Sequence, residues 1–202
     1  RPGDIEKYRG RYLSGWEEVR RRRHERLVEM GLIDERWSLS PRDEMSPRWD
    51  AVTDKEQWDL KMAVYAAMID RMDQGIGRVL DALDRLGKTS DTLVMFLSDN
   101  GGCGEHIDRT PGVPPGPVDS YCTVDAAWAN ASNTPFRRFK AFDHEGGIST
   151  PFIASWPGKL EAGSICREVG HVIDLLPTFL ELAGIPYPQE QAGAGAAWET
   201  TR

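Results

Sequence analysis

A carboxylate and an amide follow directly on an apolar run in the middle of the chain. Residues 93–97 are all apolar, and Asp99, Asn100, Gly101 and Gly102 come just after them. Such a run is typical of a buried parallel strand, whose carboxyl end lies at the sheet edge where α/β proteins bind ligands. Carboxylate and amide oxygens suit Ca²⁺ or Mg²⁺. The pattern therefore predicts Asp99 and Asn100 as metal ligands, although Asn-Gly is also a common turn signal.

A lysine later in the chain is a candidate anion-binding group. Lys140 precedes the glycine pair Gly146-Gly147 and an expected strand in residues 151–156. A cation placed there could hold an anion, but a lysine near glycines is usually just exposed to solvent. Asp70 and Asp73 lie one turn apart on an expected helix. They suit acid/base chemistry only if other site groups join them, so ordinary polar contacts are the favoured interpretation.

The elements that would position these residues alternate between helices and strands. A helix is expected over residues 16–30, and its arginine run at 20–23 is expected to be solvated. Thr53 and Glu56 predict a capping box that opens a long helix ending near Gly87. The apolar residues at helical spacing on that helix are Trp58, Met62, Tyr65, Met68, Ile69, Met72, Ile76, Val79, Leu80, Leu83 and Leu86. A last helix is expected after Asp174, and the order of elements favours a layered α/β fold.

The segment between the two candidate sites is a long loop. Residues 103–133 are rich in proline and glycine, and a loop of this length in a compact domain is usually functional or mobile. His106, Tyr121 and Trp128 are candidates for substrate contact, with scattered surface positions as the commoner alternative. Cys103 and Cys122 either pair across this loop or remain thiols, and with Cys166 they lack the spacing of a zinc site.

Composition excludes some partners. The 202 residues carry a net charge of −7, with a pI near 5.2, which argues against nucleic acid or an anionic membrane as the main partner. No apolar run reaches the length of a membrane span, and the first residues lack the apolar core of a signal peptide. Residues 189–202 show no core signal, so we expect a disordered tail or a truncation scar there.

Several blocks together resemble the formylglycine-dependent sulfatases, and bacterial arylsulfatases in particular. The resemblance covers about residues 5–188 in the family's order. The blocks are Lys7-Tyr8-Arg9-Gly10-Arg11-Tyr12, Tyr65 to Asp73, Ser98-Asp99-Asn100-Gly101, Trp128-Ala129-Asn130-Ala131, Thr134-Pro135-Phe136-Arg137, Glu145-Gly146-Gly147 and Asp174 to Thr178.

The resemblance implies a sulfuric ester hydrolase of the alkaline-phosphatase-like layered α/β/α fold, with a mainly parallel sheet. Asp99 and Asn100 match the family's second pair of metal ligands, for Ca²⁺ or alternatively Mg²⁺. Lys140 matches the lysine that grips a sulfate oxygen, and His144 stands where some relatives have an aromatic residue. An aryl or carbohydrate sulfate is the implied substrate, and a periplasmic or secreted location is the family's expectation.

Two motifs expected in this family are missing from the sequence. The motif C/S-x-P-x-R, whose first residue becomes the formylglycine nucleophile, is absent, as are the first pair of acidic metal ligands. We therefore expect residues 1–188 to be part of a catalytic domain without its amino-terminal half, and to be inactive alone. Two alternatives stay open: a phosphate or phosphonate ester hydrolase of the same superfamily, and a non-catalytic Ca²⁺-binding or carbohydrate-binding module.

Overall fold

The computed structural model describes residues 1–188, so the expected tail at 189–202 lies outside the described residues. The described residues form two compact units, residues 1–164 and residues 165–188. Within the described part, no helix is both long enough and apolar enough to cross a membrane.

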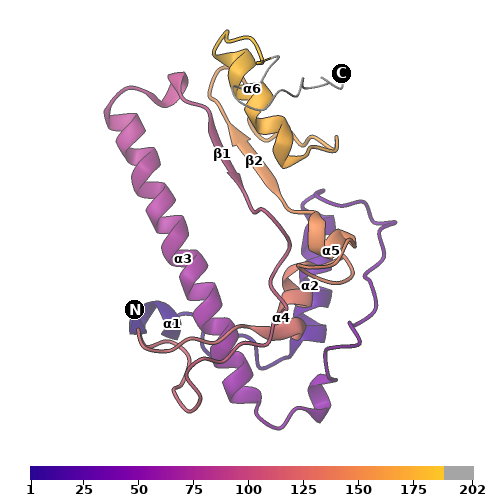
Figure 1. Cartoon of the computed structure of the whole chain (residues 1–202). Helices are drawn as coiled ribbons and strands as arrows, with labels where there is room; N and C mark the ends of the chain where they lie inside the picture. The colour runs from indigo at the N-terminus through magenta and orange to yellow at the C-terminus, as the bar shows by residue number, and fades with distance from the viewer. Residues whose placement is uncertain (189–202) are drawn as a thin grey trace. The chain divides into compact units, whose positions relative to one another are not determined.

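The first unit is mainly helical (Figure 1). Its elements are α1 (Pro2–Glu6), α2 (Trp16–Glu29), the 3₁₀ turn η1 (Trp49–Ala51), α3 (Lys55–Arg85), η2 (Thr89–Asp91), β1 (Val94–Leu97), α4 (Asp125–Ser132), α5 (Glu145–Ile148) and β2 (Phe152–Ser155). The second unit contains η3 (Val172–Asp174) and α6 (Leu175–Leu182). The expected helices are thus confirmed to within a residue or two at their ends.

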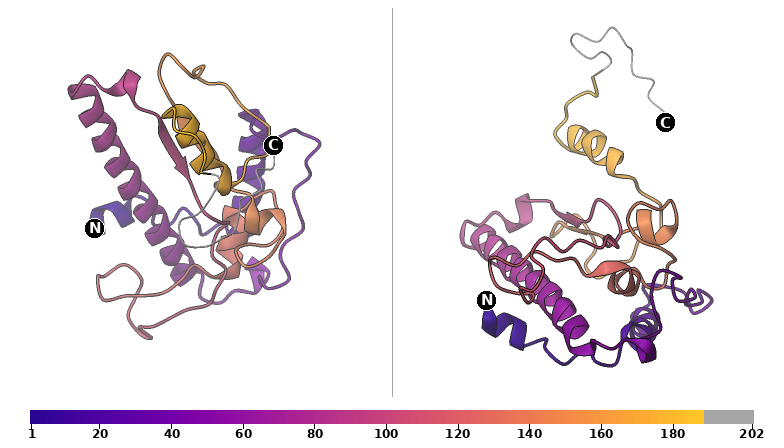
Figure 2. Two further views of the ribbon diagram at one scale, coloured as in Figure 1. Left: turned by 45° about the horizontal axis from the view of Figure 1, so that its top comes forward. Right: turned by 60° about the horizontal axis from the view of Figure 1, so that its bottom comes forward.

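Tryptophans form the main core, where α2 packs beside α4 (Figure 2). Trp16 and Trp128 are almost completely buried, and their rings meet edge to face at 5.4 Å between centroids. Each indole N–H donates to a carbonyl oxygen, Trp16 to Pro47 at 2.9 Å and Trp128 to Trp58 at 3.0 Å. The polar edge of each ring is therefore satisfied inside the core. Edge-to-face pairs of this kind add about 0.5–1.5 kcal/mol each beyond burial.

Acidic residues of α3 hold the amino-terminal segment against the helix. The buried Asp59 accepts hydrogen bonds from the backbone N–H groups of Gly10 and Tyr12, at 2.7 and 2.8 Å. Asp70 accepts from the Lys7 ammonium and the Tyr8 hydroxyl. These two carboxylates thus explain why acids interrupt the apolar stripe of α3. Asp70 makes structural contacts, as the sequence favoured, and Asp73 is exposed.

The sheet differs from the sequence expectation. Among the described residues it has two strands, and β1 pairs antiparallel with β2, with Val94 opposite Ser155 and Leu97 opposite Phe152. The parallel arrangement expected of the first strand is therefore not found between these two. The chain between them returns through the short helices α4 and α5 at one end of the sheet instead of crossing over its face (Figure 1). The strands are also more exposed than a buried parallel strand would be.

Three local expectations are wrong. The α3 helix begins after Asp54, without a side-chain cap, so the capping box at Thr53 does not form. Arg20 is buried rather than solvated because its guanidinium donates to the carbonyl and hydroxyl oxygens of Ser40, both at 2.8 Å. The apolar stripe of α3 is only partly covered, since Met68, Val79 and Leu86 remain 61–72% exposed.

Candidate functional site

The turn that follows β1 is fixed by its backbone. Gly101 is buried, and its N–H donates to the carbonyl oxygen of Gly147 at 2.9 Å. The Thr150 hydroxyl donates to the carbonyl oxygen of Ser98 at 2.9 Å. Asp99 and Asn100 therefore sit on a turn that is tied at both ends to the segment leading into β2.

Lys140 lies in direct backbone contact with this turn. Its N–H donates to the carbonyl oxygen of Gly102 at 3.0 Å, and the Gly102 N–H donates to the side-chain oxygen of Asn133 at 2.9 Å. The Asn133 amide in turn donates to the carbonyl oxygen of Arg138 at 3.2 Å. The Asn133 side chain thus clamps the turn to the lysine loop, and the fold brings together the residues that sequence analysis placed in one site.

Glycines allow this close packing. A Cβ atom at Gly101 would overlap the carbonyl oxygen of Gly146, and one at Gly147 would overlap the carbonyl oxygen of Phe142. A Cβ at Gly146 would meet the carbonyls of Arg137 and Arg138. The glycines of the two motifs are therefore required where the turn, the lysine loop and α5 press against one another.

The backbone around Lys140 is unusual. Arg138 and Ala141 both have positive φ, at 64° and 79°, a region that side-chain-bearing residues rarely adopt. Arg138 is held there by ion pairs with Asp43, at 3.3 Å, and Glu44, at 2.5 Å. Strain of this kind persists only where surrounding contacts fix it, and it is frequent at functional sites.

The charged groups of the site are exposed and have no partner among residues 1–188. The side chains of Asp99 and Lys140 are exposed, and within residues 1–188 neither makes a hydrogen bond or an ion pair. The Asn100 amide nitrogen donates to the carbonyl oxygen of Gly101 at 2.8 Å, which leaves its side-chain oxygen available. The Asp99 carboxylate and the Lys140 ammonium thus belong to segments that a backbone hydrogen bond joins, and they do not pair with each other.

The donor set fits only part of a Ca²⁺ site. Ca²⁺ takes six to eight oxygen ligands, and this turn offers the oxygens of Asp99 and Asn100. Among the described residues, no group of three or more His, Cys, Asp or Glu side chains could hold a metal ion. The oxygen chemistry is suitable, but further ligands would have to come from outside this turn.

His144 lies at the rim of the same region, at the start of α5. Its ring is exposed and meets the ring of Phe142 edge to face, with 6.4 Å between centroids. Phe142 packs in turn on the buried Phe139, next to Lys140 in the chain. Stacked rings therefore connect His144 to the lysine loop.

Of the three candidate substrate contacts in residues 103–133, one is buried in the core and two lie at the surface. Trp128 is fully buried in the tryptophan core, so its expected role in substrate contact is wrong. His106 and Tyr121 are exposed, and the His106 ring bonds to Asp125 at 2.6 Å. All three cysteines are free thiols, so the pairing of Cys103 with Cys122 is not formed.

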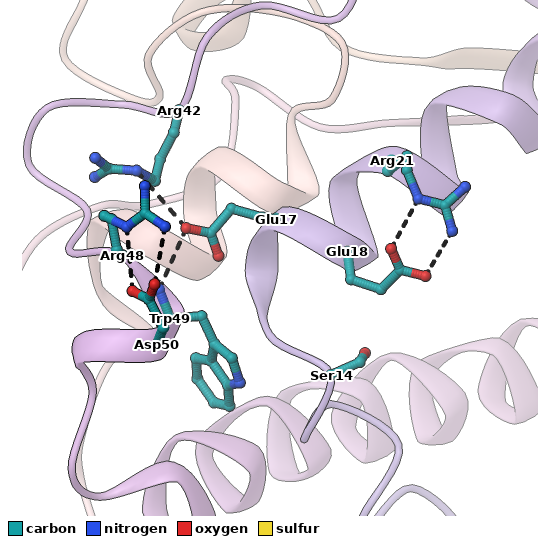
Figure 3. Close-up of a pocket in the computed structure, with 8 residues that line it drawn as sticks. All are labelled: Ser14, Glu17, Glu18, Arg21, Arg42, Arg48, Trp49 and Asp50. Atoms are coloured by element: carbon teal, nitrogen blue, oxygen red, sulfur yellow. Dashed lines mark hydrogen bonds and ion pairs between the residues drawn. The ribbon is translucent and has the colours of Figure 1, made fainter.

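An open hollow elsewhere carries many charges without being a plausible anion site. It has a volume of about 460 Å³ and lies where α2 faces the segment around η1 (Figure 3). Its lining residues are Ser14, Glu17, Glu18, Arg21, Arg42, Arg48, Trp49 and Asp50. Each arginine already pairs with an acid, Arg21 with Glu18, Arg48 with Asp50 and Arg42 with Glu17. No cation there is left unpaired for a ligand, in contrast to Lys140.

Sequence reasoning missed two residues that organise the site. Asn133 entered the sequence analysis only as the last residue of the long loop, and Asp125 was not singled out at all. The signal available for both was the presence of a polar residue at an end of the alanine-rich stretch 126–131, where a buried helix needs partners for its terminal groups.

Comparison with known proteins identifies the family. A profile described as Sulfatase matches residues 5–185. An uncharacterized sulfatase of Schizosaccharomyces pombe is 38% identical over 91% of this chain, and an arylsulfatase of Klebsiella aerogenes is 36% identical over 90% of it. A steryl-sulfatase of Mus musculus is 35% identical over 63%.

The chain spans 36% of the yeast relative, 42% of the bacterial one and 18% of the mouse one. The matched range includes both the amino-terminal segment held by α3 and the site residues from Asp99 to Gly147. The fold class of this chain is accordingly the alkaline-phosphatase-like α/β class, and the chain contains part of that fold. The chain belongs to the sulfatase family.

Proposed function

We propose that the protein carrying this chain hydrolyses sulfuric esters. The observation that carries the proposal is the 3.0 Å hydrogen bond from the Lys140 N–H to the Gly102 carbonyl, which joins an unpaired cation to a turn bearing an unpaired carboxylate. Relatives named arylsulfatase and steryl-sulfatase support the same chemistry. A sulfate ester needs both kinds of group, a metal for its oxygens and a cation for its developing charge.

Each residue has a stated role in this proposal. Asp99 and Asn100 contribute two oxygen ligands to Ca²⁺, or to Mg²⁺. The metal, when bound, would polarise the sulfate and favour the ionised nucleophile. The Lys140 ammonium binds a sulfate oxygen and offsets charge that develops as the ester bond breaks. His144, at the rim, is proposed as a second contact to the substrate.

The nucleophile is proposed to come from outside these residues. The sequence contains no C/S-x-P-x-R motif, so a formylglycine would be supplied by another part of the catalytic domain to which residues 1–188 belong. An aryl or carbohydrate sulfate ester is the proposed substrate class. A periplasmic or secreted location is proposed because it is the location expected for this family.

Phosphate and phosphonate esters are the competing substrates. A phosphate monoester carries more negative charge than a sulfate monoester, and a single lysine beside the metal turn could bind either anion. The names of the relatives favour sulfate. A non-catalytic Ca²⁺-binding module would leave the unpaired lysine next to the turn without a purpose.

Turnover of matched esters by the full-length enzyme tests the proposal. 4-Nitrophenyl sulfate should be hydrolysed at least about a hundredfold faster than 4-nitrophenyl phosphate, and chelation should abolish activity that Ca²⁺ restores. Asp99→Ala should lower kcat/KM by about 10²-fold or more, as loss of a charge-stabilising group does. The matched control is Asp91→Ala, at an exposed aspartate of η2. Preferential turnover of the phosphate, or an unaffected Asp99→Ala enzyme, would contradict it.

A further inference from the structure

A buried carboxylate next to the site holds two basic side chains. Asp125, the first residue of α4, has a side chain only 9% exposed. One of its oxygens accepts from the Lys61 ammonium at 2.9 Å, and the other is 2.6 Å from Nδ1 of His106. Asp125 also has a positive φ of 62°, uncommon for a residue with a side chain. Such a conformation persists only because the surrounding contacts fix it.

Lys61 compensates the buried charge without help from the histidine. Its side chain is 13% exposed, and its ammonium also lies 4.7 Å from the ring centroid of Trp58. Because a buried carboxylate needs an opposite charge, this pair satisfies Asp125 whether or not His106 is protonated. The second oxygen of Asp125 is thus free to orient the imidazole.

His106 itself is mostly exposed, with its side chain 80% accessible, on a rigid stretch of chain. Antiparallel backbone bonds tie this stretch to the residues before α4, from Thr123 to Ile107 at 2.9 Å and from Arg109 to Tyr121 at 2.9 Å. The Thr123 hydroxyl adds a bond to the Glu105 carbonyl at 2.6 Å. The imidazole is therefore presented to solvent in a fixed orientation.

The imidazole lies close to the candidate active site along the chain. Gly102 bonds to Lys140, and Gly104 packs on the ring of Phe139 closely enough that a Cβ there would overlap it. His106 is four positions after Gly102 in the chain, a reach of at most about 14 Å. At that distance, His106 would contact the alcohol part of a substrate whose sulfate is bound at Lys140. It would not contact the reacting sulfur.

A carboxylate oxygen can only accept a hydrogen bond, so Nδ1 of His106 is the donor and Nε2 is the nitrogen left for a ligand. Nε2 accepts a hydrogen bond when the ring is neutral and donates one when the ring is charged. A hydroxyl group can serve either state, since it both donates and accepts.

We propose that His106, oriented by Asp125, binds a hydroxyl group of the alcohol part of the sulfate ester, and that the substrate is accordingly a carbohydrate sulfate. This inference rests on the proposed sulfatase function. His106 is then a specificity-determining residue that touches the substrate, and Asp125 is a positioning residue that acts through it.

Kinetics on two substrates test the inference in the full-length enzyme. His106→Ala should raise KM for a hexose or N-acetylhexosamine sulfate about threefold to tenfold, the effect of losing one neutral hydrogen bond. Its kcat should change little, and its kinetics on 4-nitrophenyl sulfate, which has no hydroxyl group, should stay within twofold of the parent enzyme. The matched control is His24→Ala, whose imidazole bonds to the Trp37 carbonyl.

Three outcomes would overturn the inference. An equal change on both substrates would assign His106 a structural role, and no change on either would remove it from the substrate. A parent enzyme that turns over the aryl sulfate but none of the carbohydrate sulfates would refute the inference and leave the proposed function intact. A parent enzyme inactive on all sulfates would instead refute the proposed function itself.

The positioning role of Asp125 has its own measurement. Nitrogen-15 NMR of the imidazole above pH 8 should show hydrogen on Nδ1 and a bare Nε2 for His106, and Asp125→Asn should shift this tautomer balance. If Asp125→Asn folds, its KM for the carbohydrate sulfate should rise as for His106→Ala, and the double variant should be no worse. A bare Nδ1 in the parent protein, or fully additive effects, would refute the orientation by Asp125.

Discussion

At the scale of residues, many exposed charges are paired with a neighbour, and those of the candidate site are not. Arg21, Arg36 and Arg48 are exposed, yet each is bonded to an acid close by in the chain. Lys140 and Asp99 have no such partner among residues 1–188, although backbone hydrogen bonds hold their segments together. Both side chains are exposed to solvent, so the carboxylate and the ammonium remain available to a ligand.

The role of Lys140 can be measured by removing its ammonium. Lys140→Ala should lower kcat/KM on a sulfate ester by about 10²- to 10³-fold, because a cation aimed at developing charge is worth that much when lost. The side chain is exposed and makes no described contact, so the free energy of unfolding should not change. Lys88→Ala, at an exposed lysine beyond α3, is the control. Full activity of Lys140→Ala would remove the lysine from the sulfate site.

Asp70 should make stability depend on acid pH. Hydrogen bonds from Lys7, then Gln74 and Tyr8, lower the pKa of Asp70 well below its ordinary value of 3.8. Because the folded pKa is the lower one, the stabilisation is fully present above the unfolded value and is lost as the pH falls below 3.8.

The variant Asp70→Asn should therefore have a lower Tm than the parent at pH 7, and the difference should narrow as the pH falls below 4. Asp73→Asn, one turn further along α3, removes an exposed carboxylate and should leave Tm unchanged at both pH values. A Tm difference for Asp70→Asn that stays constant from pH 7 to pH 3 would show that the charge of Asp70 is not what stabilises the fold.

At the scale of elements, glycine determines how closely the segments of the site approach. Gly147→Ala should destabilise the fold by more than about 2 kcal/mol, since the new Cβ would overlap the Phe142 carbonyl and backbone must move. Gly77→Ala, inside α3 with open space around its Cα, should instead stabilise the fold by about 0.5–1 kcal/mol. Urea unfolding of both variants measures the contrast. Equal effects would show that the close approach at Gly147 is not required.

The elements also show how far sequence could predict this fold. The helical period located α2 and α3 to within about a residue at their ends, because propensity and periodicity are local properties. The antiparallel pairing of β1 with β2 was not predictable, since an apolar run of four or five residues carries no information about its partner. The clamp by Asn133 and the burial of Asp125 arise from contacts between distant segments, which no local pattern encodes. The meeting of Asp99, Asn100 and Lys140 was anticipated only through the family resemblance.

At the scale of the whole molecule, the described part has large uncovered apolar surfaces. The far half of α3 exposes Met68, Met72, Val79 and Leu86, and β2 is exposed on both faces along its length. Exposed apolar residues gathered on one helix face and one strand are typical of a surface that another part of a protein covers. Unpaired strand edges in a two-stranded sheet add a template for association. In the proposed enzyme, the rest of the catalytic domain would cover both.

Substituting charged residues into the exposed apolar stripe of α3 should have opposite effects in the isolated chain and in the full-length enzyme. In the 202-residue chain expressed alone, Met72→Lys with Val79→Lys should raise the soluble fraction and reduce binding of the apolar dye ANS, because both side chains are exposed on α3. In the full-length enzyme, the same pair should lower the free energy of unfolding by several kcal/mol, because two charges would then be buried without partners. Ala67→Lys, at a buried position of the same helix, should destabilise both proteins and serves as the control. Equal solubility and stability of the stripe variant and its parent in both settings would show that the stripe is an exposed surface in the enzyme as well.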